Sequence, residues 1–228
     1  MIEQLLSTLK DDPPGPPPGV EFLGEVPTSG FIDGEALASA IDLEAGIAQF
    51  SSEPWLHFIL DDVELYIAKK PYRSHVSWNH INDVGAVFGT RRVEIDGREY
   101  KVRLLKSAAS GDMYTGSRSA WDPVEAYDSE WNRLMYPIHS GNHTDDRNPP
   151  LVSGEGLHFG TLAQYTDTDL VLHSAAGNGR QSWCQETSSS SPTARVHRGS
   201  SGISYLYRNT ASHATAHHGW RPVLELVQ

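Results

Sequence analysis

The chain has 228 residues, 38% of them hydrophobic and 21% charged, and its formal net charge is -11 with neutral histidines. This composition predicts a globular protein built as one sizeable domain with an arm, or as two small domains. The negative charge repels phosphate and argues against nucleic acid as a partner. No apolar run approaches the ~20 residues of a membrane span, which argues against membrane insertion.

Residues 1–19 predict an N-terminal attachment peptide joined to a Pro-rich spacer. The apolar residues of "MIEQLLSTLKDD" would share one side of a short amphipathic helix, which is marginal alone in water. In "DDPPGPPPGV", proline fixes φ and removes hydrogen-bond donors, so an extended, stiff arm is expected. A peptide on a stiff spacer suits docking onto another protein, and a frayed terminus is the alternative. The segment lacks the basic start and long apolar centre of a secretory signal, so we expect synthesis in a reducing cytoplasm.

Residues 20–53 predict a linking segment with one short helix, because Leu37, Ala40, Ile41 and Leu43 are spaced for one helical face. Two hairpins follow. Apolar residues alternate on either side of Asp61-Asp62 in "WLHFILDDVELYIAKK", and they do so again around Asp96-Gly97 in "RRVEIDGREYKVRLL". Between the hairpins, "SWNHINDVGAVFG" predicts a short helix that Ser77 caps and that ends at a turn at Gly85.

The second half of the chain predicts one more helix and then short strands. "DSEWNRLMYPI" is typical of a helix that Ser129 caps, that Glu130 complements at its positive end and that Pro137 ends. After a long polar loop over 139–156, strands are expected around "LHFGTLA", "DLVLH", "SWCQE", "ARVHRG", "ISYLYR" and "WRPVLELV". The fold class is therefore α+β, with short antiparallel strands and two or three short helices.

The patterns for metal or catalytic chemistry favour ordinary polar loops. His213, His217 and His218 lie close together, but no acidic residue stands nearby to orient an imidazole, so solvated histidines are favoured over zinc. "NHTDDRNPP" at 142–150 offers oxygen ligands for calcium without the EF-hand pattern, and a polar loop is favoured there too. The sequence has no nucleophile elbow and no phosphate-binding loop. We therefore expect no enzyme, no metal and no cofactor.

Cys184 and the tryptophans are expected inside the protein. A single cysteine excludes a disulfide within the chain, and its neighbours favour a small buried side chain over a nucleophile. Each tryptophan stands at the edge of a predicted element among core-type residues, so packing is favoured over stacking on sugars. The tryptophans are Trp55, Trp78, Trp121, Trp131, Trp183 and Trp220.

Residues 202–218, "GISYLYRNTASHATAHH", have the composition of a recognition surface. Tyr205 and Tyr207 would share one face of a strand, and small polar residues and histidines follow them. Tyrosine gives contact area at low entropic cost, and small polar groups give adaptable hydrogen bonds. A plain solvated loop is the alternative.

Several blocks carry a family resemblance when taken in order. They are "PWLHFILDDVELYIAKKPYRSHVSWNHINDVGAVFG" (54–89), the Asp96-Gly97 hairpin, "SEWNRLMYPIH" (129–139), "SWCQET" (182–187), "RVHRG" (195–199), "GISYLYRNTAS" (202–212) and "GWRPVLEL" (219–226). Together they resemble the C-type lectin-like domains of phage tail-fibre and other virion proteins. This fold is shared with formylglycine-generating enzymes and with retroelement variable proteins. The resemblance covers residues 54–228, and the "GWRPVLEL" ending with the "SWCQET" block is its most specific part.

The resemblance implies a lectin-like domain whose chain ends pair in one sheet and whose polar stretch before the final strand binds a ligand. That stretch maps onto Tyr205, Tyr207, Arg208, Asn209, Ser212, His213, Thr215, His217 and His218. Trp220 would pack as framework, and Arg221 would pair with a buried carboxylate. The cysteine pair of formylglycine-generating enzymes and the calcium-binding tripeptides of animal lectins are missing. An oxidase and calcium-dependent sugar binding are therefore not implied.

The function implied by the resemblance is that of a phage virion structural protein, a tail fibre or receptor-binding tip on the virion surface. Residues 1–19 would contact other virion proteins, and residues 202–218 would contact a host surface receptor, either protein or glycan. A homo-oligomer is expected, with a trimer as the analogy. The alternative is a head fibre or capsid decoration protein that contacts mainly other virion proteins. A polysaccharide-degrading enzyme is a third hypothesis.

Overall fold

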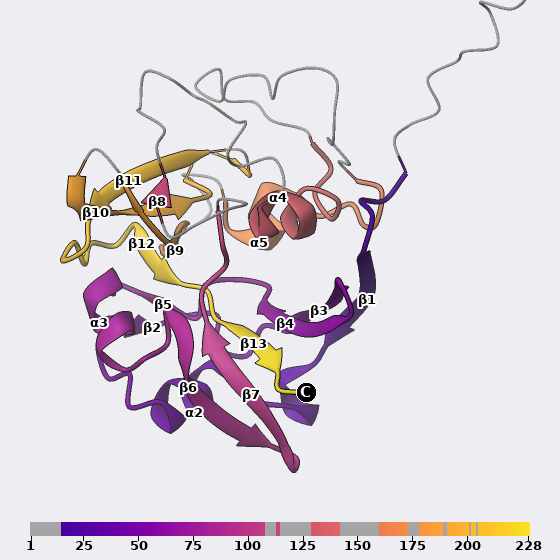
Figure 1. The fold of residues 1–228 in the computed structure, drawn as a ribbon, viewed down its shortest axis with the longest axis horizontal. Helices are drawn as coiled ribbons and strands as arrows, with labels where there is room; N and C mark the ends of the chain where they lie inside the picture. The colour runs from indigo at the N-terminus through magenta and orange to yellow at the C-terminus, as the bar shows by residue number, and fades with distance from the viewer. Residues whose placement is uncertain are drawn as a thin grey trace, which may run out of the picture.

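Two β-sheets organise the part of the chain that the computed structural model describes (Figure 1). The described residues are 15–107, 113–114, 129–141, 160–172, 178–188, 191–200, 202–203 and 205–228. The first sheet runs in the order β1 (Val20–Val26), β3 (Trp55–Leu60), β4 (Val63–Ala68), β13 (Val223–Leu226), β7 (Arg98–Arg103) and β6 (Phe88–Ile95). All of its strand pairs are antiparallel.

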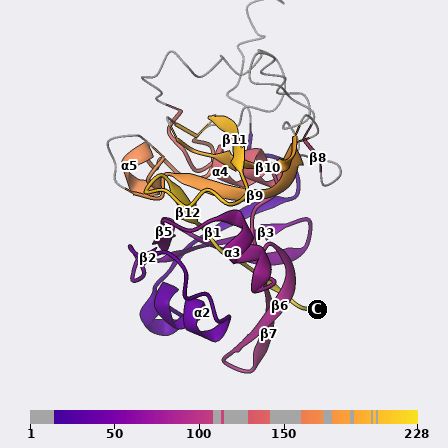
Figure 2. The ribbon, with the colours of Figure 1, turned by 90° about the vertical axis from the view of Figure 1, so that its left-hand side faces the viewer.

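The second sheet runs in the order β11 (Leu206–Thr210), β10 (Ser191–Arg198), β9 (Gln181–Ser188), β12 (His218–Trp220), β5 (Arg73–Ser74) and β2 (Ile47–Ala48). Strand β8 (Met113–Tyr114) pairs with β9, and both β8 and β12 run parallel to it. Figures 1 and 2 both place β9, β10 and β11 in the upper half of the molecule and the β6–β7 hairpin in the lower half. The α+β class predicted from the sequence is thus confirmed.

The helices are short, and polar side chains begin each of them. They are α2 (Gly34–Ala40), α3 (Trp78–Asp83), α4 (Glu130–Met135) and α5 (Asp167–Leu170), with a 3-10 turn at Thr28–Gly30. The predicted caps are confirmed, because the Ser77 hydroxyl accepts from the His80 amide at 3.1 Å and the Ser129 hydroxyl accepts from the Asn132 amide at 3.2 Å.

Both predicted hairpins are present, and their turn residues explain them. Asp61 and Asp62 have φ of 47° and 67°, and Asp96 and Gly97 have φ of 52° and 75°. Positive φ at both central residues gives the two-residue turn whose twist matches that of the flanking strands. Aspartate and glycine adopt this conformation more readily than most residues do.

The first sheet is covered on both faces. On one face, Trp55 and Tyr66 pack in a cluster with Leu37 of α2, Ile81 of α3 and Trp220. On the other face, β3 and β4 contribute to a second cluster that includes residues of α4, α5, β9 and β10. Its members from the first sheet and from α4 include Phe58, Ile67, Trp131 and Leu134.

The tryptophans and Cys184 lie where the sequence predicts them. Trp55, Trp78, Trp131, Trp183 and Trp220 are buried, and Trp121 lies outside the described residues. Cys184 is fully buried, and burial raises the pKa of its thiol well above the ordinary value. A thiol in this environment is a packing group rather than a nucleophile.

Four expectations about local structure were wrong. Ala40 is exposed, and Ala38 takes its place in the core, because the cap at Asp33 starts α2 at Gly34 and sets which residues face inward. "DLVLH" begins in helix α5, which Thr166 caps, and not in a strand. Residues 160–163 of "LHFGTLA" are not a strand. "WRPVLELV" is not one strand, because the Arg221-Pro222 break separates β12 in the second sheet from β13 in the first.

Residues 20–53 are joined to the rest of the described structure. Strand β1, which the sequence did not predict, pairs with β3 along its whole length with a bulge between Phe22 and Gly24. Leu37, Ile41 and Leu43 are buried in the core. The attachment peptide and the start of the Pro-rich spacer, residues 1–14, lie outside the described residues, as do the loop residues 142–156.

Candidate recognition site

The loop over 211–217 connects two strands that are not neighbours. It leaves β11 at the edge of the second sheet and enters β12, and β10 and β9 lie between these two strands. Backbone hydrogen bonds hold its far end, where the Gly179 amide donates to the Ala216 carbonyl at 2.7 Å and the Gln181 amide donates to the His217 carbonyl at 2.8 Å. The loop therefore crosses the end of the sheet with both ends fixed.

The structure divides the predicted site residues into three groups. Ser212, His213, Thr215 and His217 are exposed in this loop. Tyr205, Tyr207, Arg208 and Asn209 are half-buried on or just before β11. His218 is buried, with 2% of its surface exposed.

The two tyrosines share a face, as predicted from their alternation. Their ring centroids lie 6.2 Å apart, and the ring of His197 on β10 lies 6.4 Å from that of Tyr205 and 5.5 Å from that of Tyr207. Because His197 is fully buried beneath them, the tyrosines rest on the sheet rather than extending freely from it.

Asn209 joins two buried histidines. Its side-chain nitrogen lies 3.2 Å from Nε2 of His197 and 2.9 Å from Nε2 of His218. One amide group has two hydrogens and can donate to both rings when each histidine is neutral and carries its proton on Nδ1. Nδ1 of His218 then donates to the Thr215 hydroxyl at 2.9 Å. Asn209 and Thr215 therefore hold the loop in place.

His218 was wrongly predicted to lie on the recognition surface. It is the first residue of β12 and shares its side of the strand with Trp220, since side chains two apart point the same way. Its ring stacks on Trp183 with centroids 4.7 Å apart. The same alternation turns His217 outward, so counting back from the buried Trp220 would have separated the two histidines.

We expect mild acid to destabilise the protein through these buried histidines. Burial, then the nearby His213 and His217, lowers the pKa of His218 from 6.5 to about 4, and burial lowers that of His197 well below 6.5. Between these pKa values the unfolded chain binds protons that the folded chain excludes, so the free energy of unfolding decreases as the pH falls from 6.5 toward 4. The loss from His218 alone is about 2 kcal/mol at pH 5.

Urea unfolding at pH 7 and pH 5 measures this loss. The H218Q variant should show a smaller pH dependence than the wild type, and H80Q, at an exposed position on α3 whose charge does not act on His197 or His218, should keep the wild-type dependence. Equal pH dependence in H218Q and the wild type would contradict the assignment.

Among the described residues, Arg221 pairs with no carboxylate, contrary to the expectation. Its guanidinium donates to the Ser182 hydroxyl at 3.0 Å and to the carbonyls of Ala68, Lys69 and Leu170 at 2.9, 2.6 and 2.5 Å. Burial lowers its pKa to about 9, so it keeps its charge at neutral pH. Carbonyl dipoles, rather than a charge, solvate this buried cation.

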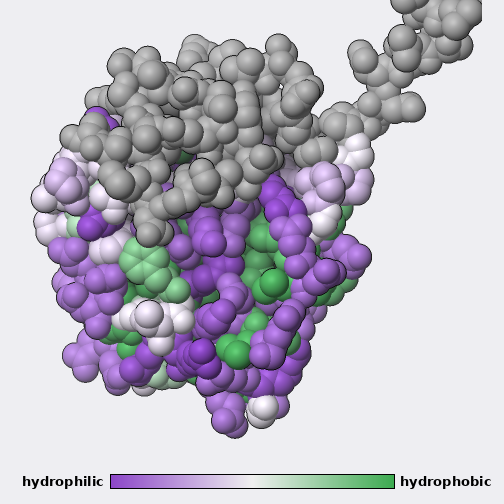
Figure 3. Space-filling view, viewed as in Figure 1, coloured by the Kyte–Doolittle hydropathy of each residue, from purple (hydrophilic) through white to green (hydrophobic). Residues whose placement is uncertain are grey.

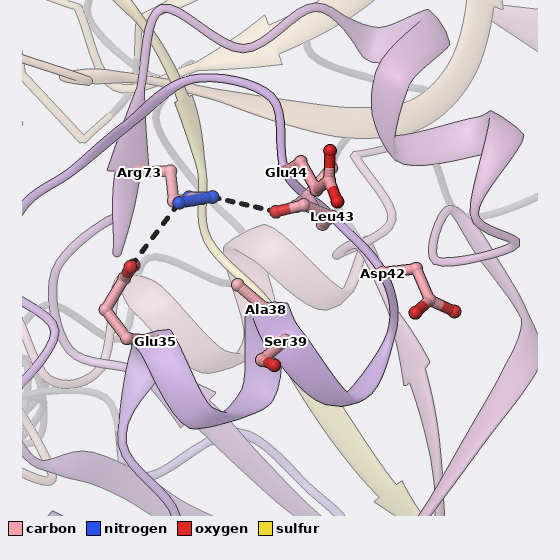
Figure 4. Close-up of a pocket in the computed structure, with 7 residues that line it drawn as sticks. All are labelled: Glu35, Ala38, Ser39, Asp42, Leu43, Glu44 and Arg73. Atoms are coloured by element: carbon pink, nitrogen blue, oxygen red, sulfur yellow. Dashed lines mark hydrogen bonds and ion pairs between the residues drawn. The ribbon is translucent and has the colours of Figure 1, made fainter.

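A separate pocket of about 250 Å³ lies between α2, the loop after it, and β5 (Figure 4). Its lining residues are Glu35, Ala38, Ser39, Asp42, Leu43, Glu44 and Arg73. Arg73 donates to the Leu43 carbonyl at 2.7 Å and lies 3.4 Å from the Glu35 carboxylate. The pocket's lining offers polar groups to a ligand, but its three carboxylates are not arranged to hold a metal ion. It stands near the edge of the second sheet that is opposite β11, so it is not part of the 205–218 site.

The surface in Figure 3 is mainly hydrophilic, with hydrophobic residues in separate groups. The exposed large hydrophobic side chains of the described residues are Leu23, Ile47 and Phe88, which lie on β1, β2 and β6. Within the same residues, no group of three or more His, Cys, Asp or Glu side chains is arranged to hold a metal ion. None of the helices described has the length and apolar character needed to cross a membrane. The 142–150 loop lies outside this region.

Comparisons of the chain with models of protein families, with curated proteins and with solved structures gave no match in any of the three.

Proposed function

We propose that the chain is a structural protein of a phage virion, exposed on the particle, and that it binds a host surface receptor through residues 205–217. The observation that carries this proposal is the exposed loop with Ser212, His213, Thr215 and His217, whose two ends are fixed in one sheet. An exposed loop of small polar residues on a rigid support can change its side chains at little cost to the core.

The chemistry of the segment supports contact rather than catalysis. Tyr205 and Tyr207 offer rings that are already packed against His197, so they lose little side-chain entropy when a partner covers them. The nearby hydroxyls and imidazoles offer hydrogen bonds in several directions. Such contacts give modest affinity for each copy of the chain, and several copies on one particle would raise it through effective concentration.

The finer fold assignment is also part of the proposal. We assign the region 54–228 to a C-type lectin-like domain on the resemblance of its sequence blocks. The β-rich architecture is compatible with this assignment, and its first and last strands, β3 and β13, lie in the same sheet with β4 between them. Residues 1–19 would attach the chain to the virion, and the assembly would be a homo-oligomer, by analogy a trimer.

Adsorption of the purified protein to host cells tests the proposal. The triple variant Y207A/H213A/H217A should retain the wild-type thermal midpoint within a few degrees but lose adsorption at least tenfold, because His213 and His217 are exposed and Tyr207 is only half-buried. The control is E94A. Glu94 is exposed on β6, an edge strand of the first sheet, whereas the loop belongs to the second sheet, so this variant should adsorb like the wild type.

The decoration hypothesis predicts a different result. If the wild-type protein binds capsids through residues 1–19 but does not adsorb to cells, the result would favour capsid decoration over receptor binding. Adsorption that the triple variant leaves unchanged would remove residues 205–217 from the receptor contact.

A further inference from the structure

The acidic residues are unevenly distributed along the chain. Although the net charge is -11, the sequence between Glu186 and Glu225 contains no Asp or Glu. The basic residues and histidines of this stretch are Arg195, His197, Arg198, Arg208, His213, His217, His218 and Arg221. The negative charge of the protein is therefore carried by the rest of the chain.

The fold gathers this stretch into one region. It forms β10, β11, the 211–217 loop, β12 and the start of β13, and Figure 1 shows the gold-to-yellow loop at the left-hand edge of the second sheet. Glu186, the residue that precedes the stretch, is buried and accepts from the Ser107 amide at 2.8 Å, so its charge does not face the loop.

Two more cationic or titratable groups lie beside the loop. Arg180 is next to Gln181, whose amide donates to the His217 carbonyl, and His75 follows Ser74, which pairs with Gly219. Partial burial and then the charges of Arg180 and His75 lower the pKa of His217. The three side chains therefore act on one another electrostatically at the end of the second sheet.

Because His197, Arg198, His218 and Arg221 are buried, the cation beside the loop is Arg180. A chain of net charge -11 is repelled by a polyanionic surface, so close approach requires a face from which carboxylates are absent and on which cations are present. The 211–217 loop has no acidic residue of its own, and Arg180 lies beside it.

We propose that the receptor bound by residues 205–217 is an anionic polysaccharide, and this inference rests on the proposed receptor-binding function. Its carboxylate or phosphate groups would lie against Arg180, His75 and His217, and its hydroxyls would bond to Ser212 and Thr215. A sugar polymer is favoured over nucleic acid, because dense phosphates require many more cations than this loop provides. The half-exposed Tyr205 and Tyr207 rings suit the apolar faces of sugars.

Binding to polymers of defined charge tests the proposal. The wild-type protein should bind immobilised polygalacturonate or alginate, which carry one carboxylate per sugar, and should not bind neutral dextran. Binding should weaken as salt rises from roughly 50 to roughly 300 mM, because charge contacts are screened. R180Q should weaken binding about fivefold or more, the loss expected for one charge-assisted contact. H217Q should weaken it less, because the lowered pKa of His217 leaves its ring a neutral hydrogen-bonding group at neutral pH.

The control is R92Q, which removes an exposed arginine on β6, and it should bind like the wild type. Circular dichroism of each variant verifies that it is folded. Absence of binding to both anionic polymers, or equal binding to neutral dextran, would overturn the proposal. Tighter binding to single-stranded DNA than to the sugar polymers would overturn it too.

Adsorption to cells separates this inference from the proposed function. If the wild type adsorbs and Y207A/H213A/H217A does not, but neither anionic polymer binds, the receptor contact stands and the ligand class is wrong. If the wild type does not adsorb to cells at all, the proposed function fails whatever the polymers show.

Discussion

Replacing Trp220 with alanine is expected to lower the free energy of unfolding by about 3–5 kcal/mol, the range observed when buried aromatic sites are emptied. The Trp220 side chain is 0% exposed and lies in the cluster that joins α2, α3 and the first sheet. Its carbonyl accepts from the Tyr72 amide at 2.9 Å, so the backbone around the emptied site is held and cannot collapse freely. Urea unfolding of the variant measures the loss.

Two further variants make this result specific. The indole nitrogen of Trp220 finds no acceptor among the described residues, so W220F gives up no hydrogen bond and should cost less than half of what W220A costs. F88A removes a ring that is 47% exposed and should cost about 1 kcal/mol or less. Equal losses in W220A and F88A would show that Trp220 does not support the core.

The elements predicted correctly are those that local chemistry determines. The Asp61-Asp62 and Asp96-Gly97 turns need positive φ, and aspartate and glycine are residue types that indicate such a turn in the sequence. Ser77 and Ser129 cap helices by accepting hydrogen bonds from the amides of residues three positions later, so the partners are close in the sequence. These predictions required no knowledge of distant contacts.

The missed elements depend on distant contacts or on short signals. Strand β1 alternates Val20 and Phe22, but the bulge at Gly24 interrupts the alternation and Leu23 is exposed on the other side. Helix α5 has only four residues, too few to show a helical period, although Thr166 and Asp169 have the spacing of a capping box.

The sequence predicted most of the exposed residues of the candidate site but not which of its histidines is buried. The sequence located the exposed Ser212, His213 and His217, because loop residues are recognisable by their polarity. The prediction did not separate His218 from them, although the period of two in a strand places His218 on the same side as the buried Trp220. The sequence does not show which backbone carbonyls lie near Arg221 in space, so its partners could not be predicted.

At the end of this chain, exposed residues of the proposed recognition loop are followed directly by buried residues of the core. His217 is exposed, whereas residues 218–224 are all buried, so the chain passes from the surface to the core between His217 and His218. The chain then crosses at Arg221-Pro222 from the second sheet into the middle of the first. A rigid crossing of this kind holds the loop still while leaving its exposed side chains free to differ.

Replacing Arg221 with methionine at this crossing is expected to lower the free energy of unfolding by a large amount. Methionine has nearly the length of arginine but no donor, so the Ser182 hydroxyl and the carbonyls of Ala68, Lys69 and Leu170 would lose their partner in a buried site. We expect a loss of about 3–5 kcal/mol in urea unfolding, because several buried acceptors are left unsatisfied at once. S182A removes one of these contacts and should cost about 1 kcal/mol. An R221M protein no less stable than S182A would mean that the guanidinium does not hold β4, β9 and α5 together.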